Sequence, residues 1–203
     1  MIFKTRFSIR HAMRIALFIA IIFISYFNPT FAGSKGEYPQ FKAEIRLTNQ
    51  FGKQWSYGQA KNKIIVLFFG YTLCPDFCPL TYEKLNRLKT LLGSRSDRLL
   101  PVMISLDPGR DKVGILKKYV DFYYPGSIGL TGSKKEIDRV VGDYKAQYEL
   151  RQSSSAAGYL IDHSTDIYLL NSRGRLIGTF SYNTTADEMY SYIKKNMALF
   201  NRS

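Results

Sequence analysis

The chain has 203 residues, and its 29 lysines and arginines against 16 aspartates and glutamates give a formal net charge of +13. This length fits one domain with a full hydrophobic core beside a targeting segment. The basic residues are scattered and no nucleic-acid motif is present, so we expect no nucleic-acid partner; a merely solvated basic surface is the simplest interpretation, and anionic lipid or an acidic protein face fits the charge next best.

Residues 1–32 have the form of a secretory signal. Four basic residues and no acid open it: Lys4, Arg6, Arg10 and Arg14. The apolar run from Ile15 to Phe27 follows, and Ala32 ends a stretch of the kind that a signal peptidase cleaves. The run is shorter than the roughly 20 residues of a membrane-spanning helix. We therefore expect export, with residues 33–203 periplasmic after cleavage, or held at the inner membrane if residues 1–32 remain as an anchor.

The exported part alternates strand-like and helix-like segments. Apolar runs at 63–69 and 99–106 predict strands that are buried on both faces. Shorter strands are expected at 128–131, 166–171 and 176–180, helices at 80–92, 112–122, 133–145 and 185–199, and a hairpin at 41–55 with a turn at 50–53. The small, polar segment 151–158 predicts a mobile loop. A parallel βαβα half followed by a hairpin and a helix predicts an α/β, thioredoxin-like fold with an added N-terminal β-hairpin.

The only two cysteines, Cys74 and Cys78, follow the first buried strand. The carboxyl end of a parallel strand is where open α/β sheets place their sites. Pro79 suits the first position of the following helix, which would put Cys78 near the N-cap, at the positive end of the helix dipole. A spacing of four residues can bring both sulfurs to one side, close enough to share a metal ion or to form a disulfide.

Three interpretations of this pair remain open. A structural disulfide is the first, although so short a loop would gain little stability from it. A redox-active dithiol is the second, although three residues rather than the usual two separate the cysteines. The third is a site for a soft metal, copper(I) or zinc, which needs at least one more ligand.

His163 is the candidate for that further ligand. His11 lies in the signal segment, so His163 is the one histidine of residues 33–203. In a thioredoxin-like fold the entry to the C-terminal hairpin packs near the loop after the first central strand. Asp162 could orient the imidazole, but neighbours in a strand point apart, so we do not expect it to. Asp111 is expected to be a helix N-cap.

Four segments resemble, in order and spacing, the Sco/SenC family of copper proteins: GYTLCPDFCP (70–79), SLDPGRD (105–111), GLTGSKKEID (129–138) and YLIDHS (159–164). The resemblance covers roughly residues 41–200. It implies a thioredoxin fold in which Cys74, Cys78 and His163 bind one copper ion. It also implies a role in building the dinuclear copper centre of cytochrome c oxidase subunit II. Leu73, Phe77 and residues 112–113 depart from the family pattern without removing a ligand.

Two functions follow as expectations. The first is an exported copper metallochaperone, not an enzyme, that carries one Cu(I) or Cu(II) ion to cytochrome c oxidase subunit II or another periplasmic copper protein. The alternative is a periplasmic thiol–disulfide oxidoreductase that keeps a partner's copper-site cysteines reduced and forms a redox disulfide between Cys74 and Cys78. A peroxidase is disfavoured, because Tyr71 stands where such a site would need threonine.

Overall fold

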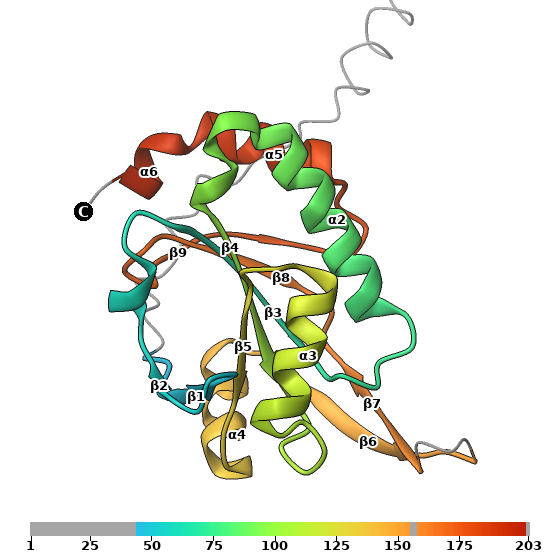
Figure 1. Cartoon of the computed structure of the whole chain (residues 1–203). Helices are drawn as coiled ribbons and strands as arrows, with labels where there is room; N and C mark the ends of the chain where they lie inside the picture. The colour runs from blue at the N-terminus through green and yellow to red at the C-terminus, as the bar shows by residue number, and fades with distance from the viewer. Residues whose placement is uncertain (1–43, 155–157, 202–203) are drawn as a thin grey trace, which may run out of the picture. The chain divides into compact units, whose positions relative to one another are not determined.

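The computed structural model of the chain describes residues 44–154 and 158–201 (Figure 1). The predicted signal or anchor, residues 1–32, lies outside these residues, as does the first part of the predicted hairpin. Within the two described ranges, no helix combines the length and the apolar character needed to cross a membrane.

The main sheet has seven strands in the order β2-β1-β5-β4-β3-β8-β9. Their bounds are β1 Leu47–Asn49, β2 Gln54–Trp55, β3 Ile64–Gly70, β4 Leu99–Ser105, β5 Ile128–Thr131, β8 Ile167–Leu170 and β9 Leu176–Phe180. β3, β4 and β5 run parallel, and β8 joins β3 antiparallel. The predicted parallel half and C-terminal hairpin are therefore confirmed. The added hairpin is also present, and β1 pairs with β5, so it widens the main sheet.

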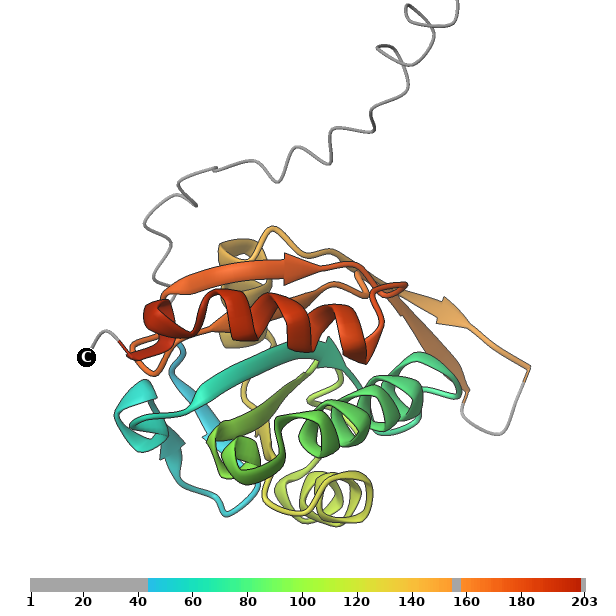
Figure 2. The same ribbon diagram turned by 90° about the horizontal axis from the view of Figure 1, so that it is seen from above.

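Helices cover both faces of this sheet (Figures 1 and 2). Their bounds are α2 Phe77–Leu92, α3 Val113–Tyr123, α4 Lys134–Asp143, α5 Ala186–Lys195 and α6 Met197–Asn201, with short 3-10 helices at Tyr57–Ala60 and Gly93–Arg98. Alternate residues of β3 enter two separate cores. Ile64, Val66 and Phe68 pack with residues of α2, α3 and α5. Ile65, Leu67 and Phe69 pack with residues of α4 and the N-terminal hairpin. The continuous apolar run of β3 is thus explained by burial on both faces.

Two helices begin with reciprocal side-chain caps. Ser133 and Glu136 form the capping box of α4. Thr185 and Glu188 form a second one at the start of α5, with the same spacing in the sequence. The predicted helix 185–199 is interrupted at Asn196, the C-cap of α5, and α6 begins at the next residue.

A second, two-stranded sheet lies apart from the main one and corrects the prediction of a loop at 151–158. β6 (Tyr148–Gln152) pairs antiparallel with β7 (Tyr159–His163), shown in orange at the lower right of Figure 1. Arg151 and Gln152 therefore belong to a strand. Most of β6 is exposed, so it lacks the buried apolar residues that made the other strands recognisable.

Candidate metal centre

The cysteine loop joins β3 to α2. The backbone N–H of Cys74 donates to Tyr71 O at 3.1 Å, which closes a turn before the helix. Asp76 is the N-cap of α2, so Cys78 is the second helical residue and Pro79 the third. The predicted placement of Pro79 at the first position is wrong by two residues. Proline is tolerated there because the first four amides of a helix have no partner within the helix. Cys78 lies in the first turn, where the helix dipole favours a thiolate.

Gly70, the last residue of β3, makes room for the buried sulfur. A Cβ atom at this position would overlap Cys78 Sγ and would lie 3.9 Å from Met103 Sδ. A side chain here would therefore displace the sulfur or the strand. The absence of a side chain at Gly70 lets Cys78 Sγ pack directly against β3.

The buried side chain of Asp111 fixes the start of the cysteine loop. Its side chain is fully buried and accepts hydrogen bonds from Thr72 N at 3.0 Å, from Thr72 Oγ1 at 2.6 Å and from Ser105 Oγ at 2.6 Å. Burial raises the pKa of Asp111, and these hydrogen bonds oppose the rise. The prediction that Asp111 is a helix N-cap is wrong, because Lys112 occupies that position and α3 begins at Val113. The carboxylate instead ties the loop after β3 to the end of β4.

Three residues that the sequence analysis did not assign to the site hold β7, the strand that carries His163. Tyr71 Oη accepts a hydrogen bond from Ile161 N at 3.2 Å. Arg110 forms an ion pair with Asp107, donates to Tyr159 O at 3.0 Å and lies 3.5 Å from the centre of the Tyr159 ring. The Tyr159 hydroxyl in turn donates to Asp107 at 2.8 Å. The loop after β4 thus clamps the start of β7. The DPGRD motif, residues 107–111, marked this loop in the sequence. Only the fold shows that the loop contacts β7.

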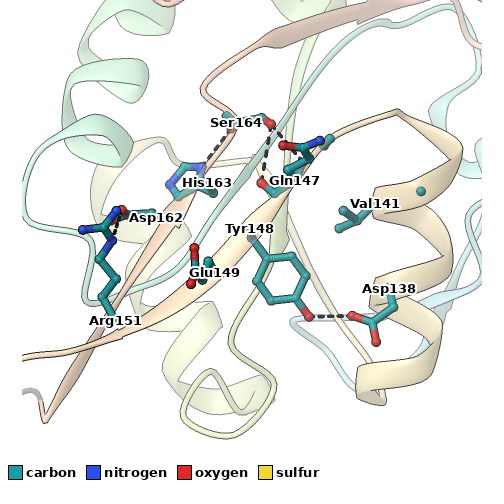
Figure 3. Close-up of a pocket in the computed structure, with 11 residues that line it drawn as sticks. Asp138, Val141, Gln147, Tyr148, Glu149, Arg151, Asp162, His163 and Ser164 are labelled. Atoms are coloured by element: carbon teal, nitrogen blue, oxygen red, sulfur yellow. Dashed lines mark hydrogen bonds and ion pairs between the residues drawn. The ribbon is translucent and has the colours of Figure 1, made fainter.

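His163 presents one ring nitrogen to the cysteines. Nδ1 lies 2.9 Å from Ser164 O, a carbonyl that can only accept, so Nδ1 carries the proton. Nε2 then has a free lone pair; it is buried and has no hydrogen-bond partner among the described residues. An imidazole held in this tautomer by a backbone carbonyl is ready to bind a metal through Nε2. As expected, Asp162 does not hold the ring and instead forms an ion pair with Arg151 (Figure 3).

The three candidate ligand atoms lie together: one from each of Cys74, Cys78 and His163, all within 4.8 Å of one another. No other group of three histidine, cysteine or carboxylate side chains in residues 44–154 and 158–201 could hold a metal ion. The predicted triad is therefore assembled by the fold, from a loop, the first turn of a helix and the end of a strand.

The two thiols are not equivalent. A hydrogen bond from Cys78, aided by backbone amides at the start of the helix, lowers the pKa of Cys74 to about 4 against the opposing effect of burial. The same hydrogen bond, together with burial, raises the pKa of Cys78 well above its usual range. Cys74 is thus a thiolate at neutral pH, and the Cys78 thiol donates a hydrogen bond to it. Both cysteines are free thiols, so a disulfide between them stays a prediction.

An open hollow of about 820 Å³ borders the other side of His163, between α4 and the β6–β7 hairpin (Figure 3). Its wall includes polar groups, among them Tyr148 Oη, which donates to Asp138 at 2.5 Å. Nε2 is buried away from solvent. The hollow therefore leaves space next to the strand that carries the imidazole, without exposing the candidate ligand atom.

The chain was compared with known proteins after this geometry was established. The family model described as SCO1/SenC matches residues 33–198. The chain belongs to the SCO1/SenC family.

Relatives support this assignment at low identity. A SCO2-like protein of Rickettsia felis is 30% identical over 154 residues, which are 75% of this chain and 75% of that protein. The mitochondrial SCO2 homologue of Mus musculus is 32% identical over 161 residues, 78% of this chain and 60% of that protein. The range matched by the family model, residues 33–198, includes Cys74, Cys78 and His163.

Solved SCO structures have the same thioredoxin-like fold. Arabidopsis thaliana ScoI with copper bound is 31% identical and has a TM-score of 0.72, covering 78% of this chain and 99% of that one. Yeast Sco1 with copper bound is 25% identical and has a TM-score of 0.71, covering 81% and 92%. The predicted fold class is confirmed.

Proposed function

We propose that the protein binds one copper ion through Cys74, Cys78 and His163 and delivers it to a partner. The observation that carries the proposal is the meeting of two cysteine sulfurs and an unpartnered imidazole nitrogen within 4.8 Å. Thiolate and imidazole are donors that suit copper. Two SCO1/SenC structures of similar fold hold copper.

Three ligands on three separate segments suit a carrier better than a permanent site. A closed structural zinc site has four ligands, whereas three leave a position open to a ligand of the partner. A partner's ligand can enter there before the carrier's ligands leave, so copper need not be released as a free ion. Copper is the cargo in this proposal, not a resident cofactor.

The partner and the location are also part of the proposal. Membership of the SCO1/SenC family supports cytochrome c oxidase subunit II, or another exported copper protein, as the recipient. The signal-like residues 1–32 support action outside the cytoplasm, either after cleavage or from a membrane anchor. Fractionation of cells checks this, and recovery of the folded protein from the cytoplasm contradicts it.

A copper titration of the reduced full chain under anaerobic conditions tests the binding site. We expect one copper per chain, and severely weakened binding in Cys74→Ser, Cys78→Ser and His163→Ala, because each removes one of three ligands. His11→Ala is the matched histidine control and should bind copper normally. Unchanged affinity and an unchanged spectrum in His163→Ala contradict the three-ligand site.

A thiol–disulfide reductase is the second candidate, favoured by the unequal thiols. The Cys74 thiolate would attack a partner disulfide, forming a mixed disulfide and releasing one partner thiolate. The Cys78 thiol would give its proton to the released partner thiolate and then attack Cys74 Sγ, which releases the second partner thiolate and leaves a Cys74–Cys78 disulfide. Two electrons thus pass to the partner.

His163→Ala separates the two candidates. Thiol exchange needs both sulfurs but not the imidazole, whereas the copper site needs all three. We expect this variant to fail in assembling a partner's copper site at limiting copper while it still reduces a disulfide substrate. Normal oxidase activity in cells that carry only this variant contradicts copper delivery and leaves the reductase.

A further inference from the structure

The outer face of α3 carries apolar and basic side chains together. Ile115, Lys118 and Phe122 follow one another at helical spacing and share one face of the helix; we call these three residues the α3 face. Ile115 is 50% exposed and Phe122 is 79% exposed. The opposite face is already used, since Leu116 and Val120 are fully buried in the core. The apolar residues of the α3 face therefore do not serve the core of the domain.

The charged residues of α3 and of the position before it are mainly lysines. α3 contains Lys117 and Lys118 against a single acid, Asp121, which lies 2.5 Å from Lys117. Lys112 precedes the helix, and the whole chain carries a formal net charge of +13. Phenylalanine and isoleucine interleaved with lysine are the composition of helices that lie in a membrane interface. Lysine stems can follow apolar surface while their ammonium groups reach lipid phosphates.

We propose that the α3 face docks on the surface of an anionic bilayer. Phe122 and Ile115 enter the boundary between headgroups and acyl chains, and the lysines contact lipid phosphates. The N-terminal apolar run from Ile15 to Phe27 gives an independent reason to place the chain at a membrane. The proposal goes beyond copper delivery and does not depend on copper binding.

Depth-dependent tryptophan quenching in the full chain tests the docking. The sequence has one tryptophan, Trp55, which is buried. In a Trp55→Phe background, Phe122→Trp places a probe on the α3 face. Leu150→Trp places a control on β6, at a residue that is 52% exposed. Both chains are reconstituted in vesicles of phosphatidylcholine with and without phosphatidylglycerol, with acyl chains brominated to quench nearby indoles.

We expect bromolipid to quench the indole of the Phe122→Trp chain strongly when phosphatidylglycerol is present and to leave the indole of the Leu150→Trp chain largely unquenched. Lys118→Glu should raise the lipid concentration needed for quenching at position 122 about thirtyfold, because each charge near an anionic surface contributes about 1 kcal/mol and the substitution changes the charge by two. Lys194→Glu, an exposed lysine on α5, changes net charge equally and should leave the quenching unchanged. If Trp55→Phe fails to fold, Trp55 is retained, since its buried ring contributes equally to both spectra.

Three results overturn the proposal. One is equal quenching at positions 122 and 150, which would reflect tethering by the N-terminus alone. Another is quenching at 122 that is insensitive to phosphatidylglycerol and to Lys118→Glu. The third is no quenching at 122, which would leave the α3 face to a protein partner instead of a bilayer.

Discussion

The two parts of the metal centre are held in different ways. The cysteine loop is fixed by a buried carboxylate, by the first turn of α2 and by direct contact with the central strand. His163 ends a strand of a two-stranded sheet that lies apart from the main one, and a few side chains, Tyr71 and Arg110 among them, fasten that strand to the main domain. The sulfurs are therefore held rigidly. The imidazole of His163 lies on the β6–β7 hairpin, here called the arm, whose position depends on a small number of contacts.

Removal of the Asp111 carboxylate should have the largest effect. Asp111→Ala leaves Thr72 N, Thr72 Oγ1 and Ser105 Oγ without their acceptor in a buried place, and we expect a loss of about 3 kcal/mol in the free energy of unfolding. Urea denaturation measures it. Asp97→Ala, at an exposed aspartate, is the control and should change stability by less than about 0.5 kcal/mol. Equal effects in both variants would mean that the cysteine loop is not held by Asp111.

Arg110→Met should loosen the arm and leave the cysteine loop intact. The variant keeps the aliphatic stem but loses the ion pair to buried Asp107 and the hydrogen bond to Tyr159 O, with an expected cost of about 2 kcal/mol. Hydrogen exchange should speed up at Ile161 N and its neighbours in β7 while Thr72 N stays protected. Faster exchange at both places would show that the two regions open as one unit.

The pH dependence of alkylation reports on the paired sulfurs. Because the pKa of Cys74 is lowered to about 4, its thiolate persists as the pH falls below neutrality, and iodoacetamide should react with Cys74 at a nearly constant rate down to about pH 5. Cys78→Ala removes the largest cause of the shift, so the pKa rises and the rate at about pH 5 should fall roughly tenfold or more. His163→Ala should slow the reaction less, because the Nδ1 proton of the imidazole is directed to Ser164 O and not to Cys74. The reverse order would make the imidazole, not Cys78, the main partner of Cys74.

The smallest effect is expected at the exposed end of the arm. Arg151 and Asp162 form an ion pair whose side chains are mostly exposed, and such pairs contribute less than about 1 kcal/mol. Arg151→Ala should leave the midpoint of thermal unfolding nearly unchanged and copper affinity unaltered. A large loss of copper binding would show that Asp162, freed from Arg151, does influence His163.

Strong local sequence patterns predicted most of the strands and helices. The exposed β6–β7 hairpin has no such pattern and was missed. The apolar run of β3 and the Ser133–Glu136 spacing each determine a local structure almost alone. β6 does not, because its exposed polar residues become a strand only through pairing with β7. The pairing is a property of the folded chain and leaves little trace in hydropathy.

The site was predictable in its ligands and not in its supports. Cysteine and histidine are rare in this chain and have specific chemistry, so Cys74, Cys78 and His163 could be found by type and order. Asp111 has an ordinary N-cap appearance in the sequence, and only the approach of Thr72 and Ser105 reveals its role. Cys78 was predicted near the N-cap of α2 and is instead its second residue. The prediction rested on Pro79, and proline fits several positions in a first helical turn.

The pairing of β3 has a consequence for the order in which the chain folds. One neighbour of β3 is β4, the next strand, but the other is β8, which the ribosome makes roughly a hundred residues later. A contact of such sequence separation forms late and slows folding. Until β7 and β8 have emerged, the core around Cys74 and Cys78, which includes Ile161 and Tyr168, is incomplete, and both thiols stay open to oxidants and stray metal ions. The newly made chain is thus most vulnerable at the residues on which its function depends.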